Sequence, residues 1–230
     1  IDFARRAGAA MKVVFQADAS VGIGQGHVMR CLTLAVALQS RGATVSFVSR
    51  NGEGNLCDVI ENRGITVVRL PERQSNGAEL WQADAEETRA AIGAKPCDWL
   101  VVDAYGVDHR WEEGMRRFAT RIMVIDDLAN RQHDCDLLLD QNLVGGMVDR
   151  YRGQVPTDCE SVLGPSFALL QPEYVEWRNK TAARNGRVGR VVVFFGGADH
   201  RNMTGQTVKA FLGMQRADVA PRVVASSGNP

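Results

Sequence analysis

Short runs of continuously apolar, mostly β-branched residues recur along the first 140 residues, and most are followed by a longer stretch with helical periodicity. The predicted strands are residues 12–16, 44–49, 66–70, 99–102, 121–125 and 137–139. The predicted helices between them are residues 28–39, 56–62, 79–92 and 109–118. Strands that are apolar throughout and alternate with helices are typical of a parallel sheet covered on both faces. The sequence therefore predicts an α/β fold that begins with a doubly wound, Rossmann-type domain.

The pattern loosens after residue 141, and the stretch KTAARNGRVG has the composition of a linker. A strand at residues 191–195 then leads into a second glycine loop, a helix from about Thr204 and a strand at residues 222–226. One βαβ unit is small for an independent domain, so we expect the second domain to be incomplete. The predicted organisation is an N-terminal domain over residues 11–165, a linker over 166–188 and the start of a nucleotide-binding Rossmann-like domain over 189–230.

Charge and cysteine content narrow the classes of partner. The chain has 27 basic and 27 acidic side chains, and this balance argues against binding of nucleic acid or an anionic membrane by the whole protein. The five cysteines are widely spaced and form no CxxC pair, so neither a zinc knuckle nor a redox dithiol is predicted. No apolar run approaches the roughly 20 residues that span a bilayer. We expect a cytoplasmic protein whose natural start is Met11, with no nucleic-acid or membrane partner.

The first strand passes into its helix through the loop ADASVGIGQGH. Gly22, Gly24 and Gly26 let the backbone turn tightly and approach a ligand, and the start of the helix offers unpaired N–H groups that suit a phosphate. The spacing G-x-G-x-G-H differs from the dinucleotide-binding motif and from the P-loop, which argues against NAD and ATP. His27 lies at the positive end of the helix, which favours a neutral imidazole able to act as a general base. The alternative is a histidine that only caps the helix, and the spacing alone favours neither.

Polar clusters follow four of the predicted strands. In open parallel sheets ligands bind beyond the carboxyl ends of the strands, so we expect these clusters to share one cleft. A single aspartate in such a position is more commonly a helix cap, but the recurrence at successive strands favours a site. The clusters are Asp18 with Ser20 to His27, Asp103 with Tyr105, Asp126 with Asp127, and Asp140 with Asn142.

The sequence contains no strong motif for binding a metal ion or a cofactor. The sequence has no H-x-H or H-x-x-x-H pattern, and no pair of carboxylates has a recognisable metal spacing. His109 and His133 lie in polar stretches and are expected on the surface. A cluster of aspartates could hold Mg²⁺, but hydrogen-bonding roles for these carboxylates are the preferred interpretation. We therefore expect neither a metal nor another cofactor.

The segment VVVFFGGADHRNMT contains a second glycine turn between a strand and a helix. Gly196 and Gly197 could form a second phosphate cradle, so that two sheet domains would hold a nucleotide-sugar from both sides. A generic turn between strand and helix is an equally good interpretation.

Five segments resemble one family, in the same order and over residues 11–211. They are ADASVGIGQGHVMRCLTLAVAL, VVDAYGVDHRWE, MVIDDLANRQHDCDLLLDQN, LGPSFALLQPEY and VVVFFGGADHRNMT. Together they are similar to the UDP-2,4-diacetamido-2,4,6-trideoxy-β-L-altropyranose hydrolases of pseudaminic acid biosynthesis. That family is in turn similar to the two-domain GT-B glycosyltransferases, and it uses water in place of a sugar acceptor.

The resemblance implies roles for individual residues. His27 is the expected base, Arg30 matches the arginine that follows it, and Tyr105 matches a tyrosine near the sugar. Gly196, Gly197 and Asp199 match the loop expected near the diphosphate. Family members continue into later motifs of the second domain that help to hold uridine and sugar, whereas this sequence stops at Pro230.

We therefore expect a UDP-sugar hydrolase that acts at the anomeric carbon with inversion. His27 would activate water, with Asp18, Tyr105 and Asp126 orienting water and sugar. Gly24, Gly26 and Arg30 would contribute to substrate binding. The alternatives are a GT-B glycosyltransferase that uses a UDP-sugar donor, and a non-catalytic module that binds a nucleotide-sugar.

Overall fold

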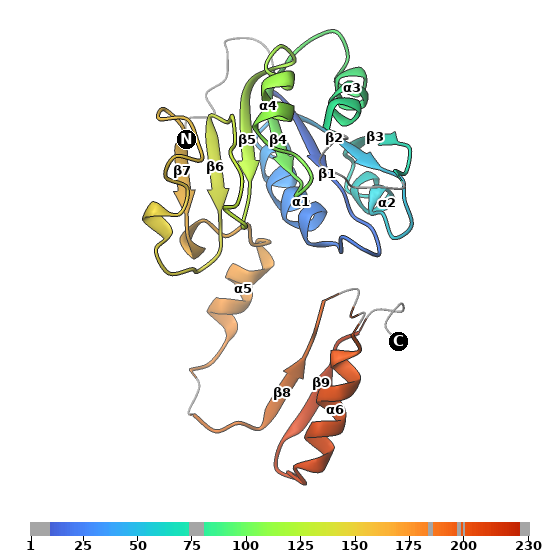
Figure 1. Cartoon of the computed structure of the whole chain (residues 1–230). Helices are drawn as coiled ribbons and strands as arrows, with labels where there is room; N and C mark the ends of the chain where they lie inside the picture. Colours follow the sequence, from blue (N-terminus) through green and yellow to red (C-terminus); the bar gives the residue numbers. More distant parts are fainter. Residues whose placement is uncertain (1–9, 74–80, 184–185, 197–198, 200, 226–230) are drawn as a thin grey trace. The chain divides into compact units, whose positions relative to one another are not determined.

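The computed structural model describes residues 10–73, 81–183, 186–196, 199 and 201–225, which form an α/β fold (Figure 1). The main sheet has seven strands, all parallel, in the order β3-β2-β1-β4-β5-β6-β7. The strands are β1 (Lys12–Ala17), β2 (Thr44–Arg50), β3 (Thr66–Leu70), β4 (Cys97–Asp103), β5 (Ala119–Ile125), β6 (Leu137–Asp140) and β7 (Glu160–Leu163). This arrangement confirms the predicted doubly wound parallel sheet.

Strand β1 is an interior strand of the sheet, between β2 and β4, and is buried on both faces. Successive side chains of a strand point to opposite faces, so Val13 and Phe15 pack in one core while Val14 packs in the other. The ring of Phe15 stacks on that of Phe47 from β2, with 4.9 Å between their centroids. Two cores, one on each face, explain why the central strands are apolar at nearly every position.

The helices supply the other half of each core. Helices α1 (Gly26–Gln39) and α2 (Cys57–Glu61) contribute side chains to the core that holds Phe15, among them Val28, Leu32 and Ile60. Helices α3 (Trp81–Ile92) and α4 (His109–Met115) contribute to the second core, with Ala85, Trp111 and Met115 fully buried. None of the described helices is long and apolar enough to cross a membrane.

Strand β7 is absent from the prediction, for a physical reason. Its sequence is ESVL, with Glu160 and Ser161 exposed and the last two residues half-buried. An edge strand of four residues with an exposed start lacks the continuous apolar run that identifies the other strands. The short 3-10 helices Met147–Asp149 and Pro165–Phe167 precede and follow it.

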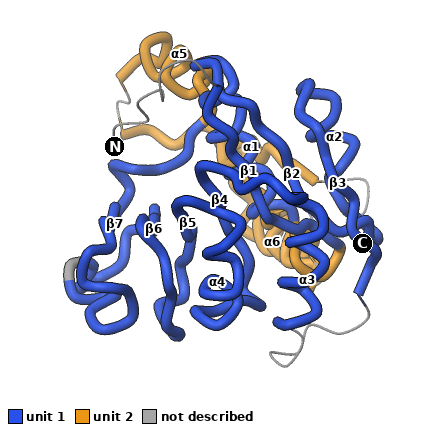
Figure 2. The backbone as a smooth tube through the Cα atoms, turned by 90° about the horizontal axis from the view of Figure 1, so that it is seen from above, with its two compact units in different colours: residues 1–20, 25–170 blue, residues 21–24, 171–230 orange. Residues whose placement is uncertain are grey.

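Residues 171–230, together with residues 21–24, form a second compact unit, and the remaining residues form the first (Figure 2). The second unit contains α5 (Glu173–Lys180), β8 (Arg190–Val193), α6 (Met203–Gly213) and β9 (Ala220–Val223). Strands β8 and β9 are parallel and pair from Arg190 with Ala220, so this part of the unit has the predicted βαβ form. Helix α5 has no buried residue. The domain boundaries at residues 165 and 189 stay a prediction.

Candidate active site

Helix α1 begins directly after the first glycine loop. Gly24 has a φ of +85°, a left-handed conformation that glycine adopts without the strain other residues incur. Gly26 is the first residue of α1, and no heavy atom lies within 4 Å of the position a Cβ would occupy there. His27 is therefore the second helical residue, and Arg30 lies one turn later on the same face.

His27 and Arg30 both contact Asp103, the last residue of β4. The Nδ1 atom of His27 lies 2.5 Å from Oδ1 of Asp103. The Nε and Nη2 atoms of Arg30 donate to Oδ2 and Oδ1 of the same carboxylate, at 2.5 and 2.6 Å. Because Asp103 pairs with Ala17 across the sheet, the end of β4 lies next to the strand that leads into the glycine loop. The topology of the sheet therefore brings these three side chains together.

The Asp103 side chain is fully buried, and yet it is held as a carboxylate. Burial by itself would raise the pKa of Asp103, but the hydrogen bonds from Arg30 and His27 outweigh it and the pKa is lowered. The pKa of Arg30 responds in the opposite sense: burial would lower it, and the hydrogen bonds to Asp103 and Asp127 raise it. Asp103 and Arg30 therefore carry opposite charges over the whole physiological pH range.

A second pair of residues continues the cluster. The Nη1 atom of Arg30 lies 3.2 Å from Oδ2 of Asp127, and the hydroxyl of Tyr105 donates to Oδ1 of Asp127 at 2.9 Å. The Tyr105 ring meets the His27 ring edge to face, with 4.5 Å between the centroids. Burial, and then the hydrogen bond to Asp127, raise the pKa of Tyr105 to about 12. Tyr105 is 47% exposed whereas His27 is 7% exposed. Tyr105 is therefore the more solvent-accessible of the two rings.

Two of the predicted site residues, Asp18 and Asp126, hydrogen-bond to groups outside the cluster around His27. Asp18 accepts a hydrogen bond from the backbone N–H of Arg50 at 2.7 Å and contacts the Ser49 hydroxyl, both on β2. Burial is the main cause of its raised pKa. Asp126 accepts from the backbone N–H groups of Leu128 and Ala129 and closes the turn that follows β5. Roles for Asp18 and Asp126 in orienting water and sugar stay predictions.

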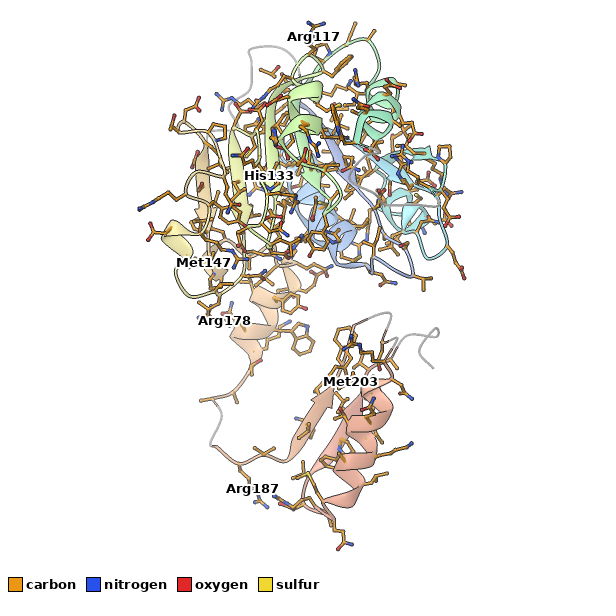
Figure 3. All side chains as sticks on the ribbon, in the orientation of Figure 1. Arg117, His133, Met147, Arg178, Arg187 and Met203 are labelled. Atoms are coloured by element: carbon orange, nitrogen blue, oxygen red, sulfur yellow. The ribbon has the colours of Figure 1, made fainter. Side chains whose placement is uncertain are left out.

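Asp126 also belongs to a buried polar network behind the site. Its Oδ1 atom lies 2.8 Å from Nη1 of Arg131, and its Oδ2 accepts from the Tyr151 hydroxyl at 3.0 Å. His133, which the sequence predicts on the surface, is buried (Figure 3). Its Nδ1 atom lies 2.8 Å from Oε1 of Glu112, which is itself fully buried. The surface prediction for His133 is wrong because a partner 21 residues earlier in the chain allows the ring to be buried.

Asp103 and Asp127 are not among the site residues predicted from the sequence. Both lie in the predicted polar clusters, at the ends of β4 and β5. After β5 the prediction selects Asp126, because periodicity locates the end of a strand without telling which of two adjacent carboxylates joins the cluster around His27. After β4 it selects Tyr105, because the resemblance implies a role for that residue. In the sequence, Asp103 stands out as the carboxylate that ends an apolar strand. In the structure it is buried, and β4 pairs with β1, the strand that precedes the glycine loop.

In the second unit, Gly196 has a φ of +78° and so requires a turn that favours glycine. Asp199 is 8% exposed and accepts hydrogen bonds from the N–H groups of Met203 and Thr204, both at 2.8 Å. It therefore caps the start of α6. Gly197 lies outside the described residues. Contacts of these three residues with a diphosphate stay a prediction.

The described residues hold no group of three or more histidine, cysteine, aspartate or glutamate side chains placed to bind a metal ion. The cluster around His27 instead combines a carboxylate, a guanidinium, an imidazole and a phenol. These groups can transfer a proton and bind a polar or anionic ligand.

Comparison with known proteins identifies relatives of the chain. No protein-family model matches it. It is 29% identical over 228 residues to the UDP-2,4-diacetamido-2,4,6-trideoxy-β-L-altropyranose hydrolase of Campylobacter jejuni, which covers 96% of this chain and 71% of the relative. It is 21% identical over 213 residues to an uncharacterized protein of Methanocaldococcus jannaschii, covering 90% of this chain and 41% of that protein.

Among solved structures, MurG from Acinetobacter baumannii is similar with a TM-score of 0.52 and 11% identity. The match covers 94% of this chain and 67% of MurG. At this level of identity the likeness concerns the fold alone. The resemblance predicted from the five segments is thus confirmed: the chain is a relative of the UDP-2,4-diacetamido-2,4,6-trideoxy-β-L-altropyranose hydrolase and has a GT-B-like α/β fold.

Proposed function

We propose that this protein hydrolyses a UDP-sugar at the anomeric carbon, releasing UDP and the free sugar. The substrate named for the Campylobacter relative, UDP-2,4-diacetamido-2,4,6-trideoxy-β-L-altropyranose, is the proposed substrate here. The observation that carries the proposal is the contact between His27 Nδ1 and the Asp103 carboxylate, because it makes His27 suitable as a general base.

The contact selects one tautomer of the imidazole. The Asp103 carboxylate is ionised and can only accept a hydrogen bond, so the proton of the neutral ring is on Nδ1 and the lone pair is on Nε2. A water molecule bound at Nε2 would lose its proton to His27 as its oxygen attacks C1 of the sugar. The C1–O bond then breaks, and its electron pair leaves with the diphosphate of UDP. Asp103 stabilises the imidazolium that forms, as carboxylates do in other His–Asp pairs.

The neighbouring groups have different proposed roles. Tyr105 is exposed beside the His27 ring and presents its hydroxyl, fixed by Asp127, at the surface where a sugar would bind. Arg30 is committed to two carboxylates, and we therefore assign it to fixing Asp103 and Asp127 as well as to supplying positive charge near the ligand. The backbone N–H groups at the start of α1, next to Gly24 and Gly26, suit the departing diphosphate.

The proposed stereochemistry is inversion at C1. Direct attack by water displaces UDP from the opposite face in one step, and no covalent sugar–enzyme intermediate is involved. A positioned general base contributes roughly 10²–10⁴-fold to the rate, so loss of His27 should lower UDP release by that factor.

The experiment is UDP release from the proposed substrate in ¹⁸O-labelled water, with no sugar acceptor added. We expect UDP release, with the label on C1 of the released sugar and none in UDP, and NMR should show the inverted anomer first. Label in UDP would mean attack at phosphorus and would refute the mechanism. UDP binding without release would favour a binding module, and release that needs an added sugar hydroxyl would favour a glycosyltransferase.

The matched variants are His27→Asn and His109→Asn. His27→Asn should lower release by roughly 10²–10⁴-fold while the fold is retained. His109, the first residue of α4, should be replaceable with little effect on release. Near-normal turnover by His27→Asn would remove His27 from the chemistry.

A further inference from the structure

Two of the five cysteines lie in contact although they are 24 residues apart in the sequence. The Sγ atoms of Cys135 and Cys159 are separated by 3.6 Å. Cys135 lies two residues before β6 and Cys159 immediately before β7, and these strands are neighbours in the sheet. The pairing of the strands therefore brings the thiols together. The sequence predicts no redox dithiol, because sheet neighbours of this kind leave no spacing signal.

The two thiols differ in access and in acidity. Cys135 is 1% exposed, whereas Cys159 is half-buried. The hydrogen bond between the Cys135 and Cys159 sulfurs lowers the pKa of Cys159. The same hydrogen bond, followed by burial, raises the pKa of Cys135. Cys159 is thus the thiol with more thiolate character and the one that a small solute can reach, which are the two properties of an oxidation-sensitive cysteine.

The other three cysteines lack this combination. Cys31, Cys57 and Cys97 are all buried. Burial raises the pKa of each of these thiols, that of Cys97 to about 11. They serve as internal controls, because a reagent that reacts with exposed thiolates should spare them.

We propose that Cys135 and Cys159 are a reversible dithiol–disulfide site that hydroperoxides oxidise. The Cys159 thiolate attacks one oxygen of the peroxide, the O–O bond breaks, and an alcohol or water leaves with the second oxygen, giving a sulfenic acid on Cys159. The Cys135 sulfur then attacks the Cys159 sulfur, the S–O bond breaks, and water leaves as the disulfide forms. In total two thiols lose two hydrogen atoms and one hydroperoxide becomes an alcohol, or water, and a second water. A dithiol reductant reverses the reaction.

The bridge would close a loop that supports the candidate site. The enclosed segment, residues 136–158, contains Arg150 and Tyr151. Arg150 Nη2 donates to the backbone carbonyl of Asp127 at 2.5 Å, and the Tyr151 hydroxyl contacts Asp126 and Asp140. A disulfide across this segment limits the freedom of the unfolded chain, so the oxidised protein should have the higher thermal unfolding midpoint.

The test treats the folded chain with hydrogen peroxide, alkylates the remaining thiols after unfolding, and maps them by mass spectrometry after trypsin digestion. Cleavage after Arg131, Arg150 and Arg152 places Cys135 and Cys159 on separate peptides. We expect these two peptides joined with the loss of two hydrogen atoms, while Cys31, Cys57 and Cys97 stay alkylated. Dithiothreitol should restore both thiols, and the cross-link should raise the unfolding midpoint.

The Cys135→Ser variant tests the order of events. Without its partner, Cys159 should accumulate as a sulfenic acid that a cyclic 1,3-diketone traps, and wild-type protein should give little of this adduct. Should Cys135→Ser fail to fold, the wild-type peptide map still decides. Full alkylation of both cysteines after peroxide treatment, or oxidation of the three buried cysteines at the same rate, would overturn the proposal.

Discussion

His27 and His133 each contact a buried carboxylate through Nδ1, and yet the two pairs lie in different surroundings. The contact is 2.5 Å to Asp103 for His27 and 2.8 Å to Glu112 for His133. The side chains of His133 and Glu112 are fully buried, whereas His27 retains some exposure and lies against the exposed ring of Tyr105. A His–carboxylate pair therefore indicates a general base only where the ring meets a surface that a substrate can reach. The His133 pair instead holds the interior together.

The largest effect that separates the two pairs should be on stability. Glu112→Gln removes the charge beside His133 and places an amide where Glu112 now accepts the N–H of Asp134 at 2.5 Å. We expect the free energy of unfolding to fall by about 1–3 kcal/mol, the cost of leaving the buried N–H of Asp134 without an acceptor. Urea unfolding followed by circular dichroism measures it. KM and kcat of the protein that remains folded should stay near the wild-type values, and a specific loss of kcat would show that the two pairs are not distinct in role.

A smaller effect should come from Arg131, which links the buried network to the site. Its Nε and Nη2 atoms donate to the carbonyls of Val107 and Ala104, at 2.7 and 3.1 Å, on either side of Tyr105, and its Nη1 pairs with Asp126. Ala129, at the end of the turn that Asp126 closes, has a φ of +49°. This left-handed conformation is unfavourable for alanine, so contacts from neighbouring residues must stabilise the turn. Arg131→Met should lower kcat by about tenfold, the equivalent of one hydrogen bond to a charged group.

The control for Arg131 is a double-mutant cycle with Tyr105→Phe. If Arg131 acts by positioning Tyr105, its replacement should change kcat little once the phenol hydroxyl is absent. Arg116→Met provides a matched loss of an arginine, because Arg116 pairs with Asp134 and Asp136 instead. An unchanged tenfold loss in the Tyr105→Phe background would show that Arg131 acts by another route.

The smallest effect should appear in the pH dependence of stability. The folded-state pKa of Asp103 is lowered, so its contribution is present above the unfolded pKa of about 3.9 and is lost as pH falls through the folded value. Asp18 has a raised pKa, so protonation of its carboxyl favours the folded state as pH falls. Relative to wild type, Asp103→Asn should therefore lose less stability on acidification, and Asp18→Asn should lose more. Each difference should amount to about 1.4 kcal/mol for every tenfold difference in the carboxyl's acid dissociation constant between the folded and unfolded chains.

Urea unfolding at several pH values between about pH 5 and pH 3 measures the slope of stability against pH in the wild type and both variants. Identical slopes in all three proteins would contradict the opposite behaviour assigned to the two carboxyls.

The sequence predicts the parallel sheet well because its central strands are buried on both faces and so carry unbroken apolar runs. It misses β7, whose exposed start has no such run. Within the site, the glycine loop and the resemblance indicate His27, Arg30 and Tyr105, and the structure brings these three together. Which carboxylates join them depends on how each turn after a strand closes. Asp126 turns inward to cap its own turn, and the adjacent Asp127 meets Tyr105 and Arg30.

Contacts between segments far apart in the sequence are the part that no local pattern indicates. Glu112 and His133 are 21 residues apart, and Cys135 and Cys159 are 24 apart. Each pair exists because neighbouring elements of the sheet domain lie side by side. Periodicity predicts the elements, but it does not say which polar side chains meet where two of them come together.

The most direct test of the proposed catalytic pair is a double-mutant cycle of His27→Asn and Asp103→Asn, read as the rate of UDP release. If Asp103 acts by fixing the tautomer of His27 and stabilising its imidazolium, the double variant should be no slower than His27→Asn alone. Losses that multiply in the double variant would show that the two residues act independently, and the proposed base would then lack the partner on which its chemistry depends.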